Sequence, residues 1–150
     1  MSHTYAKLLY HCVFSTKDRL PQIQNPMRDR LCAYIGGILE HRGGRLIKAG
    51  GTENHVHLLA ELNTTVSVSD IMRDVKANSS KWIHETFPAA ASFQWQTGYA
   101  AFTVSTSAVP DVIRYLEHQD EHHQTRTFEQ EFVEFLQRHS IEFDERYLLD

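Results

Sequence analysis

The chain contains two histidines separated by one residue, His55-Val56-His57, and a tyrosine, Tyr115, that stands four residues before Gln119. Neutral imidazole is the commonest side-chain ligand of divalent metal ions. Alternate residues of a strand point to the same side, so the two imidazoles would lie side by side on one face. Residues i and i+4 of a helix are neighbours, so Tyr115 and Gln119 would be presented together. The pattern predicts a tyrosine nucleophile assisted by a metal ion.

Each of these residues also has a simpler explanation. In the run from His55 to Leu62, one alternate set of side chains is apolar and would face the core, which leaves the histidines as polar positions on a half-exposed strand. A helical tyrosine such as Tyr115, beside Leu116, is usually a core aromatic. Gln119 by itself indicates nothing. These four residues alone therefore do not establish the chemistry, and the rest of the chain must support it.

The size and composition of the chain fit one globular domain, residues 1–150. Hydrophobic residues make up 41% of the sequence and aromatic residues 11%, which is enough for a core. No apolar run approaches the ~20 residues of a membrane span, and the N-terminus lacks the order of a signal peptide. We therefore expect a cytoplasmic protein with no membrane partner, in which Cys12 and Cys32 are reduced, buried small hydrophobes.

The charge of the chain argues mildly against a nucleic-acid partner. The formal net charge is −4, whereas a nucleic-acid-binding surface is normally basic. The acid is concentrated at one end, because residues 1–110 hold 11 Lys and Arg against 8 Asp and Glu, and residues 111–150 hold 4 against 11. Such an acidic run is more often a solvated helix face than a functional surface. The first 110 residues remain compatible with binding to DNA.

Hydrophobic patterning predicts alternating strands and helices. Strands are predicted at residues 5–15, 45–49, 55–62 and 99–105. Helices are predicted at residues 27–42 and from Ser67, which begins a capping box, to just before Pro88. The resulting order βαββαβ is typical of a ferredoxin-like (RRM-like) α+β domain with an antiparallel sheet.

Two further helices are predicted after the sheet. Pro110 fits the first turn of a helix that carries Tyr115. Thr127 and Gln130 form a second capping box, before a helix rich in phenylalanine. We expect that last helix to serve packing rather than function.

With these motifs placed, nearly the whole chain resembles the single-tyrosine transposases of the HUH nuclease superfamily, which include the REP-associated tyrosine transposases. A lone His-x-His motif would be a weak signal, but six blocks occur in the expected order. They are HCVFSTKDR, ENHVHLLAEL, SVSDIMRDVKANSSKW, WQTGYAAFTVS, VIRYLEHQDEHH and IEFDERYL. The resemblance implies an enzyme that cuts and joins single-stranded DNA at hairpin-marked sites through a 5′-phosphotyrosine intermediate.

The resemblance also implies roles for single residues. His55, His57 and Gln119 would bind a divalent metal ion, and Tyr115 would be the nucleophile. Mg²⁺ or Mn²⁺ suits this ligand set better than a structural zinc ion, which prefers four ligands and usually thiolate. No small-molecule cofactor is expected. The resemblance further implies a homodimer, and it leaves open whether the tyrosine helix completes the site of its own chain or of the partner.

Several basic and polar residues are candidates for DNA contact. Phosphate groups attract such residues, although an ordinary solvated surface explains any single one of them equally well. Trp82 falls on the apolar stripe of its helix and is interpreted as core, whereas Trp95 could stack on unpaired bases. The candidates are Lys17, Arg19, Arg73, Lys76, Ser80, Lys81 and Arg114.

Two other functions are compatible with parts of this pattern. A ferredoxin-like sheet could bind single-stranded nucleic acid without cutting it, but the aromatic signature of such modules is absent from the central strands, where a histidine pair stands instead. A HUH nuclease could also act in replication initiation or as a relaxase, but those proteins are usually larger. The sequence therefore favours a metal-dependent transposase.

Overall fold

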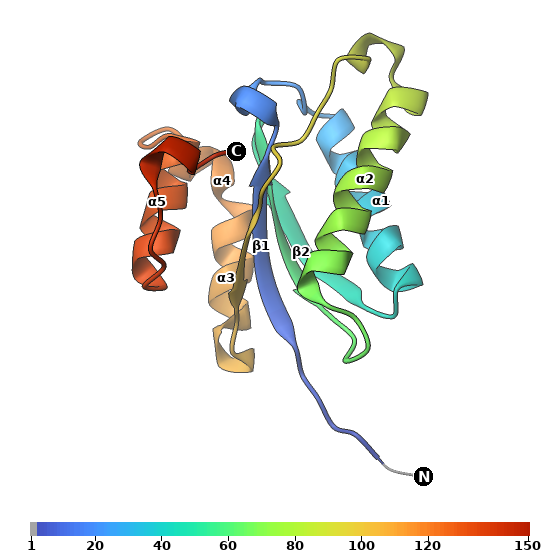
Figure 1. Ribbon diagram of the computed structural model, residues 1–150, viewed down its shortest axis with the longest axis vertical. Coiled ribbons are helices and arrows are strands. Elements are labelled where there is room, and N and C mark those ends of the chain that lie inside the picture. The colour runs from blue at the N-terminus through green and yellow to red at the C-terminus, as the bar shows by residue number, and fades with distance from the viewer. Residues whose placement is uncertain (1–2) are drawn as a thin grey trace.

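The computed structural model describes residues 3–150 and shows an antiparallel sheet with helices on both faces (Figure 1). The strands are β1 (Leu9–Ser15), β2 (Arg45–Gly51), β3 (His55–Glu61) and β4 (Ala100–Thr103), in the order β2-β3-β1-β4. Helix α1 (Met27–His41) connects β1 to β2, and α2 (Val68–Thr86) connects β3 to β4. This arrangement confirms the predicted α+β class and the βαββαβ order.

The central strand β3 is buried on both of its faces. Val56 and Leu58 point into one core, which they share with α1 and α2. His55 and His57 alternate with them and point to the other face, where they are buried as well. The predicted alternation is present, and the simpler explanation of the histidines as polar positions on a half-exposed strand does not hold, because the C-terminal helices cover that side of the sheet.

Helices α1 and α2 cover the first face of the sheet. Ser67 caps α2 by accepting a hydrogen bond from the backbone N–H of Asp70, as its motif predicts. Phe14 of β1 lies in this core and is fully buried. The helices bury one stripe each, because their apolar residues recur at helical spacing. The buried residues are Leu31, Ile35 and Leu39 of α1 and Ile71, Met72, Val75, Ser79 and Ile83 of α2.

The second face is covered by α3 (Val109–Glu117), α4 (Gln119–His122) and α5 (Phe128–Arg138) (Figure 1). Thr127 and Gln130 form the predicted capping box at the start of α5. The phenylalanines of α5 pack against the sheet, as predicted. This second core consists of Val13, Ala100, Phe102, Phe128, Phe132, Phe135 and Leu136.

The helix that carries Tyr115 is interrupted before Gln119. Helix α3 ends at Glu117, and His118 leaves the helical conformation with φ −115° and ψ 29°. Helix α4 then begins at Gln119 as a separate, short element. The prediction that Tyr115 and Gln119 share the face of one continuous helix is therefore wrong, and the turn at His118 sets their relative position.

Some strand boundaries differ from the predicted ones. Pairing of β1 with β3 starts at Leu9, opposite Glu61, rather than at residue 5. The segment before β1 leads away from the sheet (Figure 1). Tyr5, which precedes β1, is 92% exposed. β4 is shorter than the predicted strand 99–105, and β2 is two residues longer than predicted because its pairing with β3 continues to Gly51.

The two tryptophans both belong to the first core. Trp82 packs against it and stacks on Tyr34 at 4.9 Å between ring centroids, as its place on the apolar stripe predicts. Trp95 is buried and makes an edge-to-face contact with Phe14. The suggestion that Trp95 could stack on unpaired bases is therefore wrong.

The two cysteines are free thiols. Cys12 is buried as predicted, whereas Cys32 on α1 is only partly buried. Burial raises the pKa of Cys12 to about 12 and that of Cys32 to about 11, so neither is a reactive thiolate at neutral pH. Within residues 3–150, no helix is long and apolar enough to cross a membrane.

A close approach between β2 and α3 positions the tyrosine helix. A Cβ atom placed on Gly50 would lie 2.3 Å from the backbone oxygen of Leu116, the residue after Tyr115. No side chain fits in that space, so α3 can pack at this distance only against a glycine.

We therefore expect Gly50→Ala to lower the free energy of unfolding by about 1–3 kcal/mol, the usual cost of overpacking, because α3 must move away from β2. Gly37→Ala in α1 is the matched control, since a Cβ atom there meets nothing within 4 Å and alanine is favoured over glycine inside a helix. Urea denaturation measures both variants. Equal stability of the two would contradict the close-packing argument.

Candidate active site

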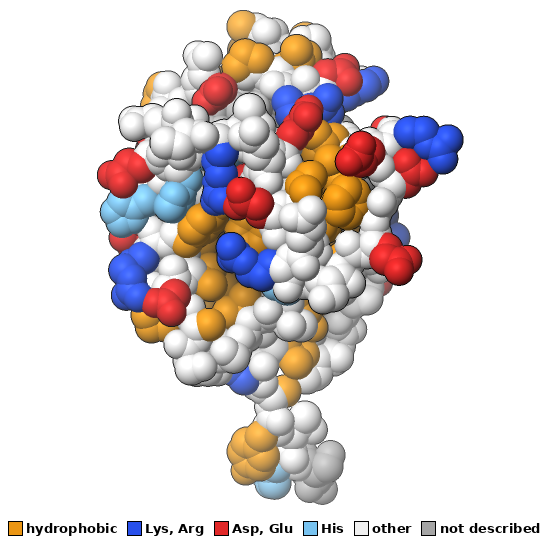
Figure 2. Space-filling view, turned by 90° about the vertical axis from the view of Figure 1, so that its left-hand side faces the viewer, with side chains coloured by type: hydrophobic (Ala, Val, Ile, Leu, Met, Phe, Trp, Pro, Cys, Tyr) orange, Lys and Arg blue, Asp and Glu red, His pale blue; other side chains and the backbone are white. Residues whose placement is uncertain are grey.

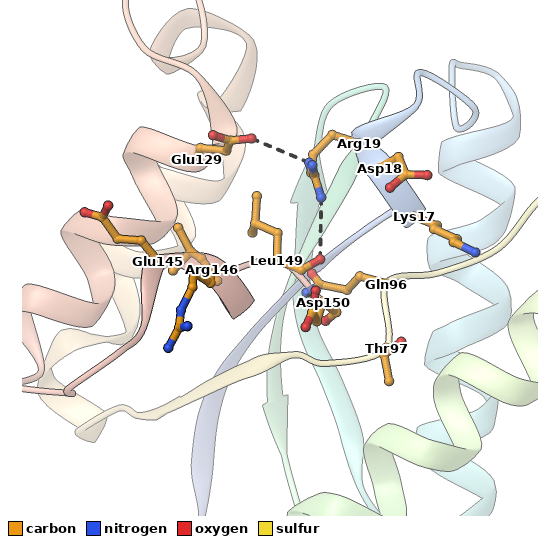
Figure 3. Close-up of a pocket in the computed structure, with 11 residues that line it drawn as sticks. Lys17, Asp18, Arg19, Gln96, Thr97, Glu129, Glu145, Arg146, Leu149 and Asp150 are labelled. Atoms are coloured by element: carbon orange, nitrogen blue, oxygen red, sulfur yellow. Dashed lines mark hydrogen bonds and ion pairs between the residues drawn. The ribbon is translucent and has the colours of Figure 1, made fainter.

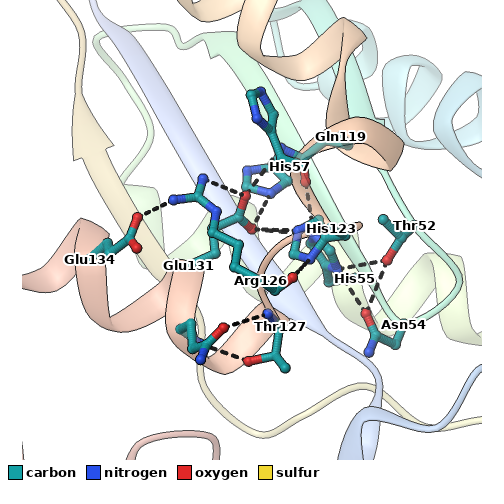
Figure 4. A network of polar contacts seen from close by, with 12 residues as sticks. Thr52, Asn54, His55, His57, Gln119, His123, Arg126, Thr127, Glu131 and Glu134 are labelled. Atoms are coloured by element: carbon teal, nitrogen blue, oxygen red, sulfur yellow. Dashed lines mark hydrogen bonds and ion pairs between the residues drawn. The ribbon is translucent and has the colours of Figure 1, made fainter.

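The histidine pair lies at the start of β3 and is covered by α4 and α5 (Figure 4). His55 and His57 are each 0% exposed, and their ring centroids lie 5.0 Å apart, so the two imidazoles stand side by side as predicted. The ring of Phe128 stacks on His55 at 4.3 Å between centroids. Replacing either histidine would therefore disturb packing as well as chemistry.

A buried carboxylate from α5 stands at the centre of the site. The Oε1 atom of Glu131 lies 2.9 Å from Nε2 of His57 and 3.4 Å from Nε2 of His55. The same oxygen lies 3.2 Å from Nε2 of His123, in the segment after α4. Glu131 is 0% exposed. One carboxylate oxygen thus faces three imidazole nitrogens (Figure 4).

His57 is held from behind by His11 of β1, whose Nε2 lies 2.8 Å from Nδ1 of His57. A carboxylate only accepts, so Nε2 of His57 donates to Glu131, and His11 donates to Nδ1 of His57. With a metal ion on Nε2, the proton would sit on Nδ1 and His11 would accept it, as outer partners of metal-bound imidazoles do. Burial, followed by the charge of His57, lowers the pKa of His11 to about 3.

His55 has the opposite proton arrangement. Its Nδ1 lies 2.8 Å from the amide oxygen of Asn54, which only accepts, so the proton sits on Nδ1 and Nε2 carries the lone pair. Burial lowers the pKa of His55 to about 4 and keeps the ring neutral. The lone pair faces Oε1 of Gln119 at 3.0 Å, while Nε2 of Gln119 donates to Glu131. Two acceptor atoms that face each other in this way suit a bound cation.

Tyr115 reaches the same carboxylate. Its hydroxyl donates to Glu131, and Arg126 donates to the tyrosine oxygen. The tyrosine ring stacks on His122 at 4.5 Å between centroids and lies 5.9 Å from the ring of His57. Burial and the negative charge of Glu131 raise the pKa of Tyr115, against the opposite effect of Arg126. In this arrangement the phenol is neutral and its proton points to the carboxylate.

Glu131 is ionised despite its burial. Burial by itself would raise the pKa of the carboxyl group, but the imidazoles around it, with His57 as a donor, outweigh burial and hold the pKa below its usual range. Arg126 adds a positive charge, with a guanidinium nitrogen 3.6 Å from Oε2 of Glu131. The negative charge is therefore matched on several sides.

The donor atoms fit a divalent metal ion. Those of His55, His57 and Glu131 lie within 4.8 Å of one another, close enough to reach one ion. Imidazole, carboxylate and amide oxygen are ordinary ligands of Mn²⁺ and similar ions. The structure brings the three predicted ligands, His55, His57 and Gln119, to one place and adds Glu131.

Sequence reasoning assigned α5 to packing and missed Glu131. A usable signal exists, because Glu131 shares a helix face with Phe128 and Phe135, and an acidic residue inside an apolar stripe is unusual. Arg126 and His11 carry no comparable signal. Only the fold brings them to the site.

Two of the predicted DNA contacts border a cleft of about 470 Å³ that is also lined by the C-terminal residues (Figure 3). Lys17 is exposed, and Arg19 lies 3.6 Å from Glu129 of α5 and 3.5 Å from the backbone oxygen of Leu149. Asp18 and Arg19 have left-handed backbone angles, with φ of 58° and 56°. Such angles cost free energy for residues other than glycine, so neighbouring contacts must hold this turn in place.

Four other candidates lie on α2, across the sheet from Tyr115 (Figure 1). The ammonium group of Lys76 donates to the backbone oxygens of Thr97 and Gly98, at 2.8 and 2.7 Å, and burial lowers its pKa to about 8. Lys76 therefore serves the fold at this position. Arg73 and Lys81 are exposed, and Ser80 is partly buried.

The candidate nearest to the site is Arg114, which precedes Tyr115 on α3 and pairs with Asp111. Figure 2 shows the side of the molecule that carries the C-terminal helices, and basic and acidic side chains are intermixed there around exposed apolar atoms. The predicted DNA contacts are thus distributed over separate surfaces, and no single basic patch gathers them.

Comparison with known proteins gives consistent matches. A family model described as "Transposase IS200 like" matches residues 4–119. The transposases for insertion sequence element IS200 of Salmonella typhimurium and Salmonella typhi are each 28% identical over 123 residues, which cover 77% of this chain and 80% of each relative. The matched model includes the histidine pair, Tyr115 and Gln119 and ends before α5.

Two solved structures are similar in fold. A Deinococcus radiodurans R1 protein assigned as a transposase has a TM-score of 0.65 and 24% identity, covering 79% of this chain and 96% of that chain. A REP-associated tyrosine transposase bound to a REP hairpin has a TM-score of 0.60 and 15% identity, covering 82% of this chain and 73% of that chain. At 24% and 15% identity, the similarity to these two structures supports the fold of this chain alone.

In metal-free buffer we expect the folded state to lose stability as the pH falls from about 6.5 to about 4. Burial holds the pKa of His11 at about 3 and that of His55 at about 4, below the ordinary value of 6.5. The unfolded chain therefore takes up protons in this range that the folded chain does not. Urea denaturation at a series of pH values measures the loss.

His11→Asn should reduce this pH dependence, because asparagine can still donate to His57 but does not titrate. His41→Asn, at the exposed end of α1, is the control and should leave the dependence as it is. If the free energy of unfolding of His11→Asn falls with pH as steeply as that of the unaltered protein, His11 is not among the groups responsible.

Proposed function

Because the chain belongs to the IS200-like transposase family, we propose that it is a metal-dependent enzyme that cleaves and rejoins single-stranded DNA at hairpin-marked sites. One observation carries the proposal, which is that the Tyr115 hydroxyl and the histidine pair meet at the carboxylate of Glu131. Burying ionised and polar groups costs free energy unless they are matched, and a simple binding module has no use for such a cluster. Catalysis explains it better than binding alone.

Tyr115 is the nucleophile in this proposal. Its oxygen forms a bond to the scissile phosphorus while the bond from phosphorus to the 3′ oxygen breaks. Glu131 accepts the hydrogen bond of the hydroxyl and orients the attacking oxygen. The phenolic proton leaves to water as the new bond forms, and the departing 3′ oxygen takes a proton from water. The product is a 5′-phosphotyrosine with a free 3′-OH. Another 3′-OH can reverse the attack, so strands can be rejoined without ATP.

The residues around the histidine pair would hold a divalent ion. Mg²⁺ or Mn²⁺, bound by His55, His57 and Gln119, would neutralise charge on the scissile phosphate and stabilise the leaving 3′ oxygen. His11 and Asn54 orient the two imidazoles from behind through their Nδ1 atoms. Positive charge beside Glu131 would also offset the effect by which that carboxylate raises the pKa of Tyr115.

Arg126 lies where the transferred phosphate would form. Its guanidinium donates to the Tyr115 oxygen and also pairs with Glu134 on α5. Guanidinium groups bind phosphate oxygens in a planar, two-pronged geometry. We assign Arg126 to holding the phosphate during and after the transfer.

The proposed substrate is single-stranded DNA with a hairpin. One relative of similar fold is bound to a REP hairpin. Arg114 adjoins Tyr115, and Arg19 contacts Glu129 of α5, the helix that carries Glu131, so these two residues and Lys17, which borders the same cleft as Arg19, are proposed as DNA contacts. Arg73, Ser80 and Lys81 would meet DNA only where it passes to the other face of the sheet.

We expect hairpin DNA, incubated with the protein and Mn²⁺, to become covalently linked to Tyr115. Tyr115→Phe should abolish both cleavage and the adduct, because it removes the attacking oxygen and keeps the ring that stacks on His122. Denaturing electrophoresis detects the adduct, and peptide mass spectrometry places it.

Tyr147→Phe is the matched control, since Tyr147 is 62% exposed near the C-terminus. It should cleave like the unaltered protein. Cleavage by Tyr115→Phe, or an adduct on Tyr147, would show that the nucleophile is wrongly assigned. DNA that is bound and never cut with any divalent ion would favour the binding-module alternative.

We further propose a homodimer in which each chain carries a complete site. The dimer follows from the resemblance, and the complete site is supported by the contacts of His57 and Tyr115 with one Glu131 of the same chain. Sedimentation at micromolar concentration should give the mass of two chains. A mass of one chain would contradict the dimer.

Mixing His57→Ala with Tyr115→Phe tests how the sites are divided between the chains. We expect no recovery of cleavage after confirmed subunit exchange, because neither chain contains an intact site. Recovered cleavage would show that the tyrosine of one chain serves the metal site of the other. Circular dichroism must first establish that His57→Ala folds, since His57 is fully buried.

A further inference from the structure

We propose that His123 is a direct ligand of the divalent ion, so that three imidazoles, those of His55, His57 and His123, hold it. This inference rests on the proposed function and specifies its metal site. It assigns a role to a residue that lies beyond the part of the chain matched by the family model.

The proton on the His123 ring has a defined place. Nδ1 of His123 lies 3.1 Å from the backbone oxygen of Arg126, and a carbonyl oxygen only accepts, so Nδ1 carries the proton. In the neutral ring, Nε2 then carries the lone pair. Within residues 3–150, this Nε2 is the one buried side-chain nitrogen or oxygen that lacks a hydrogen-bond partner. Buried polar atoms are normally paired, so an unpaired one indicates a missing partner such as a metal ion.

Nε2 of His123 lies beside the ligand cluster, outside the three donor atoms of His55, His57 and Glu131 that lie within 4.8 Å of one another. Its Nε2 lies 3.2 Å from Oε1 of Glu131 without forming a hydrogen bond, and its ring lies 4.6 Å from that of His55 (Figure 4). A lone pair and a carboxylate oxygen repel each other unless a cation or a proton lies between them. Nε2 of His55, which also carries a lone pair, likewise faces an acceptor atom, Oε1 of Gln119. Two pairs of facing acceptors therefore indicate one positive charge among them.

The backbone directs His123 to this position. Its N–H donates to the backbone oxygen of Gln119 at 3.0 Å, so one helical turn separates two residues that face the same cluster. The side chain of His123 is 12% exposed. The preceding residue, His122, stacks on Tyr115 instead. Of two consecutive histidines, one thus supports the nucleophile and the other faces the ligands.

A third imidazole changes which ion the site prefers. Mg²⁺ favours oxygen ligands, whereas nitrogen ligands favour Mn²⁺ and, more strongly, Co²⁺. We therefore expect the metal-free protein to bind Co²⁺ most tightly, Mn²⁺ less tightly and Mg²⁺ least. This order can be measured without DNA.

The test measures the binding of Co²⁺ to the full, metal-free chain by isothermal titration calorimetry. We expect His123→Ala to weaken binding at least about tenfold, because even residues that only orient a ligand typically contribute 10–100-fold. His84→Ala, on α2 across the sheet, is the matched control. The ring of His84 also donates to a backbone oxygen, that of Phe93, but its side chain is exposed, and binding should be unchanged.

A second measurement counts the nitrogen ligands directly. Pulsed electron paramagnetic resonance of bound Mn²⁺, with ¹⁵N-labelled histidine in the protein, should report three imidazole nitrogens, and two in His123→Ala. Two nitrogens in the unaltered protein would overturn the inference. That count needs no variant, so it decides the question even if His123→Ala fails to fold.

The outcomes separate this inference from the proposed function. If His57→Ala loses Co²⁺ binding while folded His123→Ala binds normally, His123 only pairs with Glu131, and the inference is wrong while the function stands. If the unaltered protein binds no divalent ion, both are wrong.

Discussion

The buried carboxylate of Glu131 is the group around which the C-terminal half of the molecule is arranged. An ionised group with no exposure to water is stable only where hydrogen bonds and positive charge compensate it. His57 donates to it from β3, Tyr115 from α3, and Arg126 adds charge from the segment before α5. A single acid thus contacts three segments, and these segments carry the histidine pair, the tyrosine and the guanidinium of Arg126.

The two faces of the sheet differ in composition. One face is covered by α1 and α2 over an almost entirely apolar core. The other face combines the phenylalanines of α5 with the polar cluster, so the same helix seals the site and supplies Glu131. Two local features complete the arrangement. Gly50 lets α3 approach β2 closely, and the turn at His118 allows Tyr115 and Gln119 to reach the cluster from separate helices.

The family match and the site do not have the same extent. The match ends at residue 119, whereas Glu131, Arg126 and His123 all follow it. In the proposed active site, therefore, the segment after the tyrosine helix supplies side chains and does not only cover the sheet. A helix that only covers a sheet needs no acidic residue on its apolar face, so an acid such as Glu131 in that position indicates a further role.

Much of the fold and part of the site followed from the sequence alone. Alternation along a strand and spacing along a helix are local properties, so they placed His55 and His57 side by side and gave the order of elements. The resemblance added Tyr115 and Gln119 to the site. Only the tertiary structure decided that both faces of β3 are covered and that Glu131, 74 positions from His57, completes the cluster. Contacts between distant segments depend on how layers pack, and no local pattern encodes that packing.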